Sequence, residues 1–169
     1  MTEYYKELDW PAMPAELEVE AIEFAKTAVN IDGVKNHPAK EKKYMEMFPG
    51  ADFSQFAVPS SVEQWVRENL PITDAHVVKM QQHINMPFGV PHKDVSRANA
   101  FNYLLTEGDA ETIWFKDGGV EAGRVQYKKG VWYFHESRVF HQVVGMTHYR
   151  LAITVFVPET QTHEKVVMS

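Results

Sequence analysis

The feature that most constrains the fold is a change in residue pattern at Pro71. Beyond it, the chain consists of short runs rich in Val, Ile, Phe, Tyr and Trp, interrupted by Gly, Pro and Asp. Such runs between turn-forming residues are typical of β-strands, and their number and spacing favour a closed or sandwiched antiparallel sheet. Lys128-Lys129-Gly130 reads as a hairpin turn between the fourth and fifth strands. The predicted strands cover 75–84, 98–106, 111–116, 123–128, 131–136, 141–145 and 149–157.

The residues before Pro71 have a helical pattern instead. Apolar side chains recur at helical spacing over 15–29, directly after Pro14. A second, shorter helix is predicted over 36–48. Ser60-Ser61-Val62-Glu63 resembles a capping box and predicts the start of a third helix, which ends before Pro71.

Length and composition indicate one soluble globular domain. The 169 residues, 44% of them hydrophobic and 24% charged, are enough for a single core. We expect a helical N-terminal part (1–72) to support a β core (73–158), a mainly β architecture with N-terminal helices.

Composition also excludes several classes of function. No apolar run approaches the ~18 residues needed to span a bilayer, and the N-terminus is too polar for a signal peptide, so we expect a cytoplasmic protein. The absence of cysteine excludes disulfides and thiolate metal ligands. A net charge of −6 without a Lys/Arg cluster argues against nucleic acid as a partner.

A His-x-Asp pair and a later His form a candidate metal site. Residues i and i+2 of an extended chain point to the same side, so His92 and Asp94 can converge on one point. His141 lies far along the chain, but strand pairing around a barrel can bring it to the same place. Two imidazoles and one carboxylate on one face form the triad that binds Fe(II) and leaves coordination positions open.

Arg150 begins an apolar strand and is the candidate anion-binding residue. Period-two alternation places it on one face with Ala152 and Thr154. An Arg on an inner face costs free energy unless an anion pairs with it, and a ligand carboxylate held by two parallel hydrogen bonds removes that cost. The alternative is that Arg150 faces solvent or pairs with Glu111 or Glu136.

The order of these residues resembles that of the 2-oxoglutarate/Fe(II)-dependent dioxygenase superfamily, whose fold is a double-stranded β-helix (jelly roll, cupin-like). Its members share a His-x-Asp pair, a distal His and an Arg about nine residues later. Residues 97–105 and 111–115 are similar to a strand pair of prolyl-hydroxylase-like members. Residues 86–92 are similar to the aspartyl/asparaginyl-hydroxylase branch, and 130–134 to the segment before the distal His. The resemblance covers about half of the chain.

The resemblance implies roles for five residues. His92, Asp94 and His141 would be the iron ligands and thus the catalytic centre. Arg150 would bind the distal carboxylate of 2-oxoglutarate, with a hydrogen bond added by the phenol of Tyr103.

The chain departs from the superfamily at Ala152, where many members have a Ser. A second hydroxyl contact to the acid would then come from Tyr103 or Thr154. Two further histidines are near the motif: His83 reads as a structural residue that could line the pocket, and His135 as structural or exposed.

The implied function is an Fe(II)- and 2-oxoglutarate-dependent dioxygenase that consumes O2 and produces succinate and CO2. Hydroxylation is expected, because Asp94 is retained whereas halogenating members have lost this carboxylate. The similarity to prolyl- and aspartyl/asparaginyl-hydroxylase-like members and the absence of a basic surface favour an amino acid or a peptide side chain as substrate. Two alternatives remain: a cupin-type metal enzyme independent of 2-oxoglutarate, and a non-catalytic β-barrel that binds a small acid. The cupin-type enzyme would have no need for Arg150.

Overall fold

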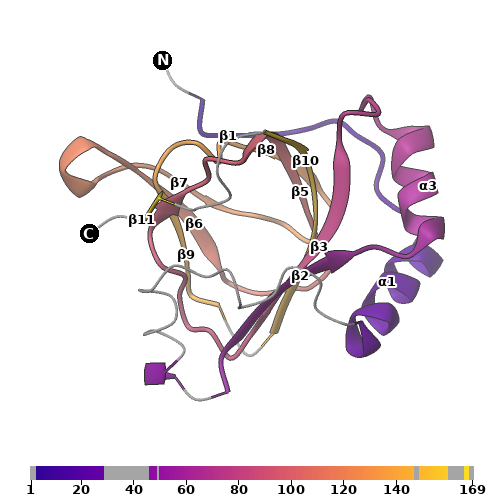
Figure 1. Ribbon diagram of the computed structural model, residues 1–169, viewed down its shortest axis with the longest axis horizontal. Coiled ribbons are helices and arrows are strands. Elements are labelled where there is room, and N and C mark those ends of the chain that lie inside the picture. Colours follow the sequence, from indigo (N-terminus) through magenta and orange to yellow (C-terminus); the bar gives the residue numbers. More distant parts are fainter. Residues whose placement is uncertain (1–2, 29–45, 49, 147–148, 160–165, 168–169) are drawn as a thin grey trace.

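The strands of the computed structural model form two antiparallel sheets that face each other (Figure 1). The structure describes residues 3–28, 46–48, 50–146, 149–159 and 166–167. The first sheet has the order β1 (Tyr5–Glu7), β8 (Trp132–His135), β5 (Arg97–Leu104), β10 (Tyr149–Pro158), β3 (Val77–Ile84) and β2 (Asp52–Ala57). The second has the order β11 (Val166–Val167), β4 (His92–Lys93), β9 (His141–Val144), β6 (Glu111–Lys116) and β7 (Val120–Gln126).

Alternation along β10 divides the interior into two layers. Leu151, Ile153 and Val155 lie on the outer face of the first sheet and belong to the largest apolar cluster. Ala152 lies on the inner face, in a second cluster between the sheets that includes Trp114 and Tyr133. This arrangement follows from the period of two in a strand buried on both sides.

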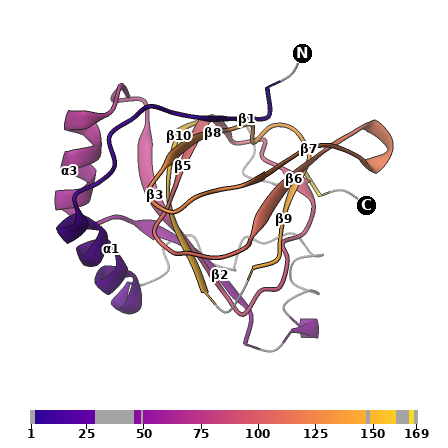
Figure 2. The same ribbon diagram turned by 180° about the vertical axis from the view of Figure 1, so that it is seen from behind.

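Two helices, α1 (Ala15–Thr27) and α3 (Ser60–Asn69), cover the outer face of the first sheet (Figure 2). The predicted capping box at the start of α3 does not form. Pro59 is the N-cap residue and no side chain caps the helix. The Glu63 carboxylate pairs with Arg67 at 3.0 Å, and Ser61 donates a hydrogen bond to Glu20 at 2.6 Å.

The predicted fold class is confirmed: the chain is mainly β with N-terminal helices and forms a double-stranded β-helix. Residues 1–72 are not purely helical, however, because β1 and β2 form the two edges of the first sheet. The predicted helix over 36–48 lies outside the described residues apart from 46–48.

The hairpin predicted at Lys128-Lys129-Gly130 is wrong. β7 pairs with β6, whereas β8 pairs with β5 and β1, so the chain crosses from one sheet to the other at this point. Gly130 has a positive φ of 75°, which glycine adopts easily. A turn with this conformation can occur in a connection between sheets as well as in a hairpin, so the glycine did not distinguish the two. Among the described helices, none is long and apolar enough to cross a membrane.

Candidate metal centre

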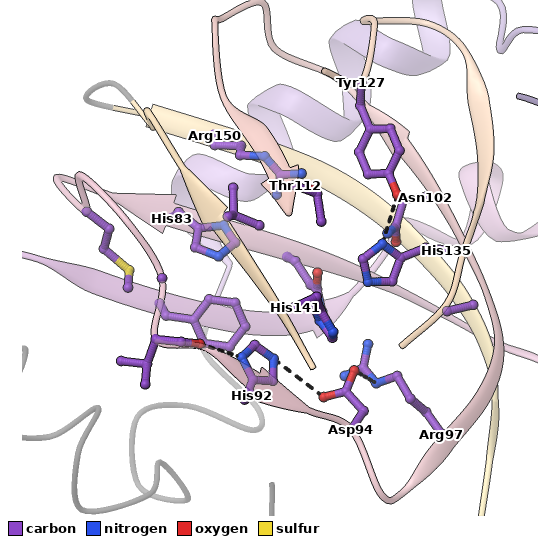
Figure 3. A pocket seen from close by; sticks show the side chains of 17 residues that line it. His83, His92, Asp94, Arg97, Asn102, Thr112, Tyr127, His135, His141 and Arg150 are labelled. Carbon is purple, nitrogen blue, oxygen red and sulfur yellow. Dashed lines mark hydrogen bonds and ion pairs between the residues drawn. The ribbon is translucent and has the colours of Figure 1, made fainter. Parts of the chain in front are cut away.

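A cavity of about 90 Å³ lies between the two sheets and receives side chains from both (Figure 3). One water needs about 10–15 Å³ of such space, so the cavity has room for a small organic molecule or several waters. Its lining is apolar at Phe53, Met86 and Val90, and elsewhere it is mostly polar.

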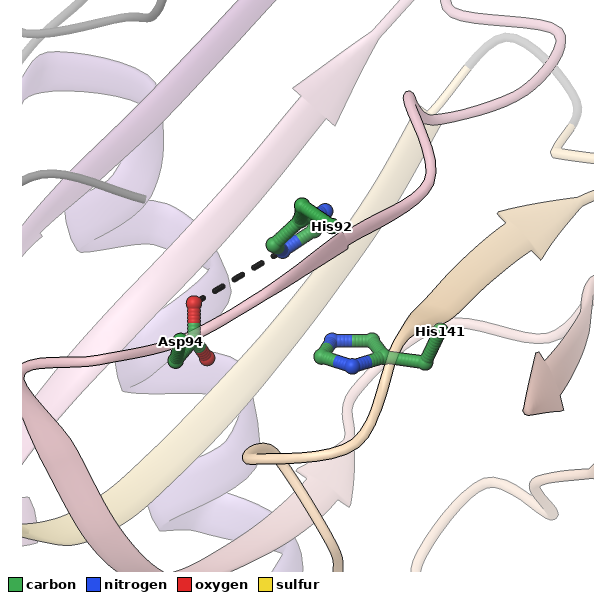
Figure 4. A group of neighbouring side chains, drawn as sticks. All are labelled: His92, Asp94 and His141. Atoms are coloured by element: carbon green, nitrogen blue, oxygen red, sulfur yellow. Dashed lines mark ion pairs between the residues drawn. The ribbon is translucent and has the colours of Figure 1, made fainter. Parts of the chain in front are cut away.

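His92, Asp94 and His141 line this cavity, and their side chains lie close together (Figure 4). β4 and β9 pair so that His92 lies directly opposite His141, and their ring centroids are 4.6 Å apart. Asp94 follows β4, where its backbone N–H donates to the Ser137 carbonyl at 2.8 Å. One potential ligand atom from each of the three side chains lies within 4.8 Å of the others. The structure thus brings together the three residues that the sequence predicted as a metal site.

Both histidines are oriented by the main chain. His92 Nδ1 lies 2.7 Å from the Val90 carbonyl, and His141 Nδ1 lies 2.8 Å from the Val139 carbonyl. Since a carbonyl only accepts, each Nδ1 carries the proton and each Nε2 carries the lone pair in the neutral ring. Metal-binding histidines are typically fixed in this way. Two Nε2 atoms and a carboxylate fit a divalent metal such as Fe(II).

Arg150 lies on the inner face of β10 and lines the same cavity. It is buried, and its Nε has no hydrogen-bond partner within the described part of the chain. Burial lowers the pKa of Arg150 to about 10, although Tyr127 opposes the shift. The alternative partner Glu111 pairs with Arg124 instead, at 3.1 Å. A buried guanidinium of this kind is stabilised by a ligand carboxylate.

Tyr103 does not lie in the cavity, which corrects the role that the resemblance implied. Its hydroxyl donates to the Glu18 carboxylate and accepts the Met13 N–H at 3.1 Å. Alternation on β5 directs Asn102 into the cavity and Tyr103 outward, into the cluster beneath the helices. Thr154 is also absent from the lining, and the cavity's hydroxyl groups come from Thr112 and Tyr127.

His135 lines the cavity as well, although the sequence interpretation treated it as structural or exposed. Its Nδ1 lies 2.8 Å from the Tyr127 hydroxyl, and its ring meets that of His141 edge-on, with centroids 4.7 Å apart. Burial, and after it the proximity of His141, keep the pKa of His135 well below its ordinary value. The sequence signal was present: Tyr133 and His135 alternate with Trp132 and Phe134, as expected for a polar inner face.

Sequence comparison gives no relative, because no family model and no curated protein matches the chain. Comparison of structures does find similar folds. A Pseudomonas putida prolyl-4-hydroxylase superposes with a TM-score of 0.56 at 18% identity, over 94% of both chains.

Two weaker matches have TM-scores below one half. The viral collagen prolyl hydroxylase from Paramecium Bursaria Chlorella virus-1 has a TM-score of 0.47 at 12% identity, over 94% of this chain and 97% of that one. Procruciferin, an 11S globulin from Brassica napus, has a TM-score of 0.43 at 10% identity. The present chain is covered over 71% in that match but spans only 28% of the globulin chain.

The fold and the site together define the class of this protein. It has a double-stranded β-helix fold similar to that of the prolyl-4-hydroxylase, and the cavity between its sheets carries a candidate His-Asp-His metal site.

Proposed function

We propose that the protein is an Fe(II)- and 2-oxoglutarate-dependent dioxygenase that hydroxylates an amino acid or a peptide side chain. The observation that carries the proposal is the position of Arg150. A buried guanidinium with no anionic partner in the described chain lines the same cavity as a complete His92, Asp94 and His141 triad.

A dicarboxylate with an α-keto group fits these two features. One end needs a metal with open coordination positions, which a three-residue protein site leaves. The other end needs a fixed cation, which Arg150 provides. A cupin-type enzyme that does not use 2-oxoglutarate gives no reason to bury this charge.

The side chains of the protein position the reactants and exclude water. His92 and His141 would hold the metal through Nε2, and the backbone carbonyls at Nδ1 keep the rings in place. Arg150 orients the acid by two parallel hydrogen bonds. When bound, the metal and its acid supply the oxidation of a substrate C–H bond by O2, with succinate and CO2 as by-products. Phe53, Met86 and Val90 provide an apolar wall that keeps bulk water from the site.

Two observations support the substrate class. The chain is acidic, with a net charge of −6, which does not suit a nucleic-acid substrate. The fold is similar to that of a protein described as a prolyl-4-hydroxylase. An amino acid or a peptide side chain is therefore the substrate proposed.

The first experiment is an anaerobic titration of the full-length protein with Fe(II) and then 2-oxoglutarate. A visible metal-to-ligand charge-transfer band that needs both components is expected. Binding of Fe(II) without any band or heat from 2-oxoglutarate would instead support the cupin-type alternative. Binding of 2-oxoglutarate without metal would support the non-catalytic acid-binding barrel.

The second experiment identifies the substrate. Protein, Fe(II), 2-oxoglutarate and isotopically heavy O2 are incubated with pools of amino acids and peptides, and the products are analysed by mass spectrometry. A product and succinate that each carry one heavy oxygen atom are expected. A labelled product found only in lipid, nucleobase or secondary-metabolite pools would contradict the substrate class.

A further inference from the structure

The Asp94 carboxylate has two oxygens in different surroundings. Oδ1 lies 3.7 Å from His92 Nε2, on the side of the proposed metal ligands. Oδ2 lies 3.2 Å from Arg97 Nε and forms an ion pair with it (Figure 3). We infer that Arg97, held in place by Gln55, is a positioning residue that directs a single oxygen of Asp94 to the metal. This inference rests on the proposed function of the site.

Arg97 is fixed from three directions. Its Nη2 donates to Gln55 Oε1 at 3.2 Å, and the same oxygen accepts Gln81 Nε2 at 3.2 Å. The guanidinium lies over the Phe156 ring, 4.3 Å from its centroid. The side chain of Arg97 is only 12% exposed and that of Asp94 8% exposed. A planar guanidinium held by its Nε and Nη2 edges and by stacking on its face has little freedom to turn.

A β-bulge places Arg97 in the cavity. β5 pairs with β10 through Phe101↔Val155 and then Ala98↔Val157, so β5 has one extra residue in this interval. Asn99 lies within it and has a positive φ of 49°. Because of the extra residue, Arg97 lies on the inner face with Asn102, whereas regular alternation would turn it outward with Tyr103. Bulges that redirect a side chain are frequent beside active sites.

Gln55 gives the N-terminal part of the chain a role in the site. It belongs to β2, an edge strand that precedes the region of sequence resemblance, and its side chain connects β2 with β3 and β5. The polar connection therefore runs from Gln81 through Gln55 and Arg97 to Asp94. No metal-ligand pattern in the sequence includes Gln55 or Gln81.

The consequence concerns coordination. A carboxylate can bind a divalent metal with one oxygen or with both. With Oδ2 engaged by Arg97, Asp94 occupies one coordination position, and the others stay open for a chelating acid and for O2. Without Arg97, Asp94 loses the contact that engages Oδ2 and can bind the metal with both oxygens, which would close one of these positions.

Two effects of Arg97 on metal binding oppose each other. Its positive charge repels a divalent cation, whereas its contact with Oδ2 orients a ligand. Loss of a residue that orients a metal ligand typically weakens metal binding about 10–100-fold. The Arg97 charge is already paired with the Asp94 carboxylate at 3.2 Å, so its repulsion of the metal is reduced. The orienting effect of Arg97 on Asp94 should therefore exceed its repulsion of the metal.

The test measures binding of Co(II) to the full-length protein by calorimetry and the visible absorption of bound Co(II), which depends on coordination number. The variants are Arg97→Met, Arg97→Lys and Gln55→Leu. Two matched controls remove similar contacts outside the cavity: Arg124→Met, which loses the pairs with Glu111 and Glu121, and Gln64→Leu, which loses a contact with Glu68. Thermal unfolding of each metal-free variant shows whether it folds.

Arg97→Met is expected to bind Co(II) about 10–100-fold more weakly and with a changed absorption spectrum. Arg97→Lys, which keeps the charge but lacks the planar guanidinium that presents separate donor edges to Asp94 and Gln55, should lie in between. Gln55→Leu should weaken binding in the same direction but less, and both controls should match the wild-type protein. If Arg97→Met does not fold, Gln55→Leu, which keeps the arginine and its stacking, decides the question.

Wild-type affinity and spectrum in both Arg97→Met and Gln55→Leu would overturn the positioning role of Arg97 but not the metal site. Tighter Co(II) binding by Arg97→Met would have the same consequence. A wild-type protein that binds no Co(II) would overturn the metal site, and the inference with it. If the wild-type protein binds Co(II) but not 2-oxoglutarate, the proposed function fails while the positioning role of Arg97 can still be judged from the variants.

Discussion

Arg150 illustrates at the scale of a single residue how binding and stability oppose each other. Its guanidinium is buried and its Nε lacks a hydrogen-bond partner among the residues described, so the metal-free, acid-free protein carries an uncompensated desolvation cost. A bound carboxylate would remove this cost. The side chain is therefore unfavourable for the isolated fold and favourable for a complex.

The first prediction follows from this opposition. Arg150→Met should stabilise the ligand-free protein by about 1–2 kcal/mol, because an apolar side chain of similar length fills the same space without a charge. It should also weaken 2-oxoglutarate binding by about 2–4 kcal/mol, because a charge-assisted bidentate contact is lost. Urea unfolding measures the first effect, and calorimetry of the Fe(II)-loaded protein measures the second. Unchanged affinity for the acid would refute the role of Arg150.

The second prediction concerns the metal ligands. His141→Ala should lose iron binding and turnover, since a site with two remaining protein ligands is incomplete. His76→Ala is the matched control, because His76 contacts Thr73 and lies outside the cavity. Metal content after dialysis and succinate release are the measurements. Full occupancy and activity in His141→Ala would show that the metal site is assigned wrongly.

At the same scale, the sequence predicted the functional residues that lie close together in the chain. It missed the residues whose orientation, into the cavity or away from it, depends on how the strands pair. His92 and Asp94 are two positions apart in an extended segment, so their convergence follows from strand geometry alone. Tyr103 was placed one position away from the side chain that enters the cavity, Asn102, because nothing in an apolar strand reveals which face is inner. His135 was missed because a polar side chain in a strand usually indicates solvent, whereas here it indicates a cavity.

At the scale of elements, sequence patterns did not predict the bulge in β5 or the strands β1, β2, β4 and β11. β2 (Asp52–Ala57) has mixed polar and apolar residues and is defined only by pairing with β3. The bulge at Asn99 depends on register with β10, a strand about fifty residues further along the chain. The seven strands from β3 and β5 to β10, together with helices α1 and α3, have strong local patterns and were predicted to within a few residues.

The third prediction tests the bulge. Asn99 is exposed and has φ of 49°, a conformation that glycine adopts freely and a β-branched residue avoids. Asn99→Gly should keep wild-type metal affinity. Asn99→Val should destabilise the fold by about 1–2 kcal/mol or regularise the strand, and regular alternation would turn Arg97 out of the cavity. Unfolding and Co(II) titration of both variants are the measurements, and equal behaviour of the two would contradict this role of the bulge.

At the scale of the whole molecule, the cavity lies between two sheets that different parts of the chain build. The first sheet provides Arg97, Arg150 and His135, and the second provides His92 and His141. A ligand that contacts both sets therefore links the two sheets. Binding energy at the site should appear as stability of the entire fold.

The fourth prediction is an ordered stabilisation. Fe(II) or Co(II) alone should raise the unfolding temperature, and 2-oxoglutarate should raise it further only when metal is present. A ligand at 100 times its dissociation constant stabilises the folded state by about 2.7 kcal/mol. Thermal unfolding under anaerobic conditions, with EDTA to remove the metal, measures both steps. A rise with 2-oxoglutarate after EDTA treatment would contradict the order.

The aromatic contacts of Trp114 connect the first residues of the chain with the metal site. Tyr5 stacks on the Trp114 indole at 5.7 Å between centroids, and the other neighbours of that indole include His135 at 5.3 Å. In the strand register, Trp114 lies opposite His141. A fluorophore thus lies beside the site, and its emission should change when a metal binds to His141. A substitution that removes the Tyr5 ring should alter the same signal, so this emission depends on the packing of β1 as well as on the metal.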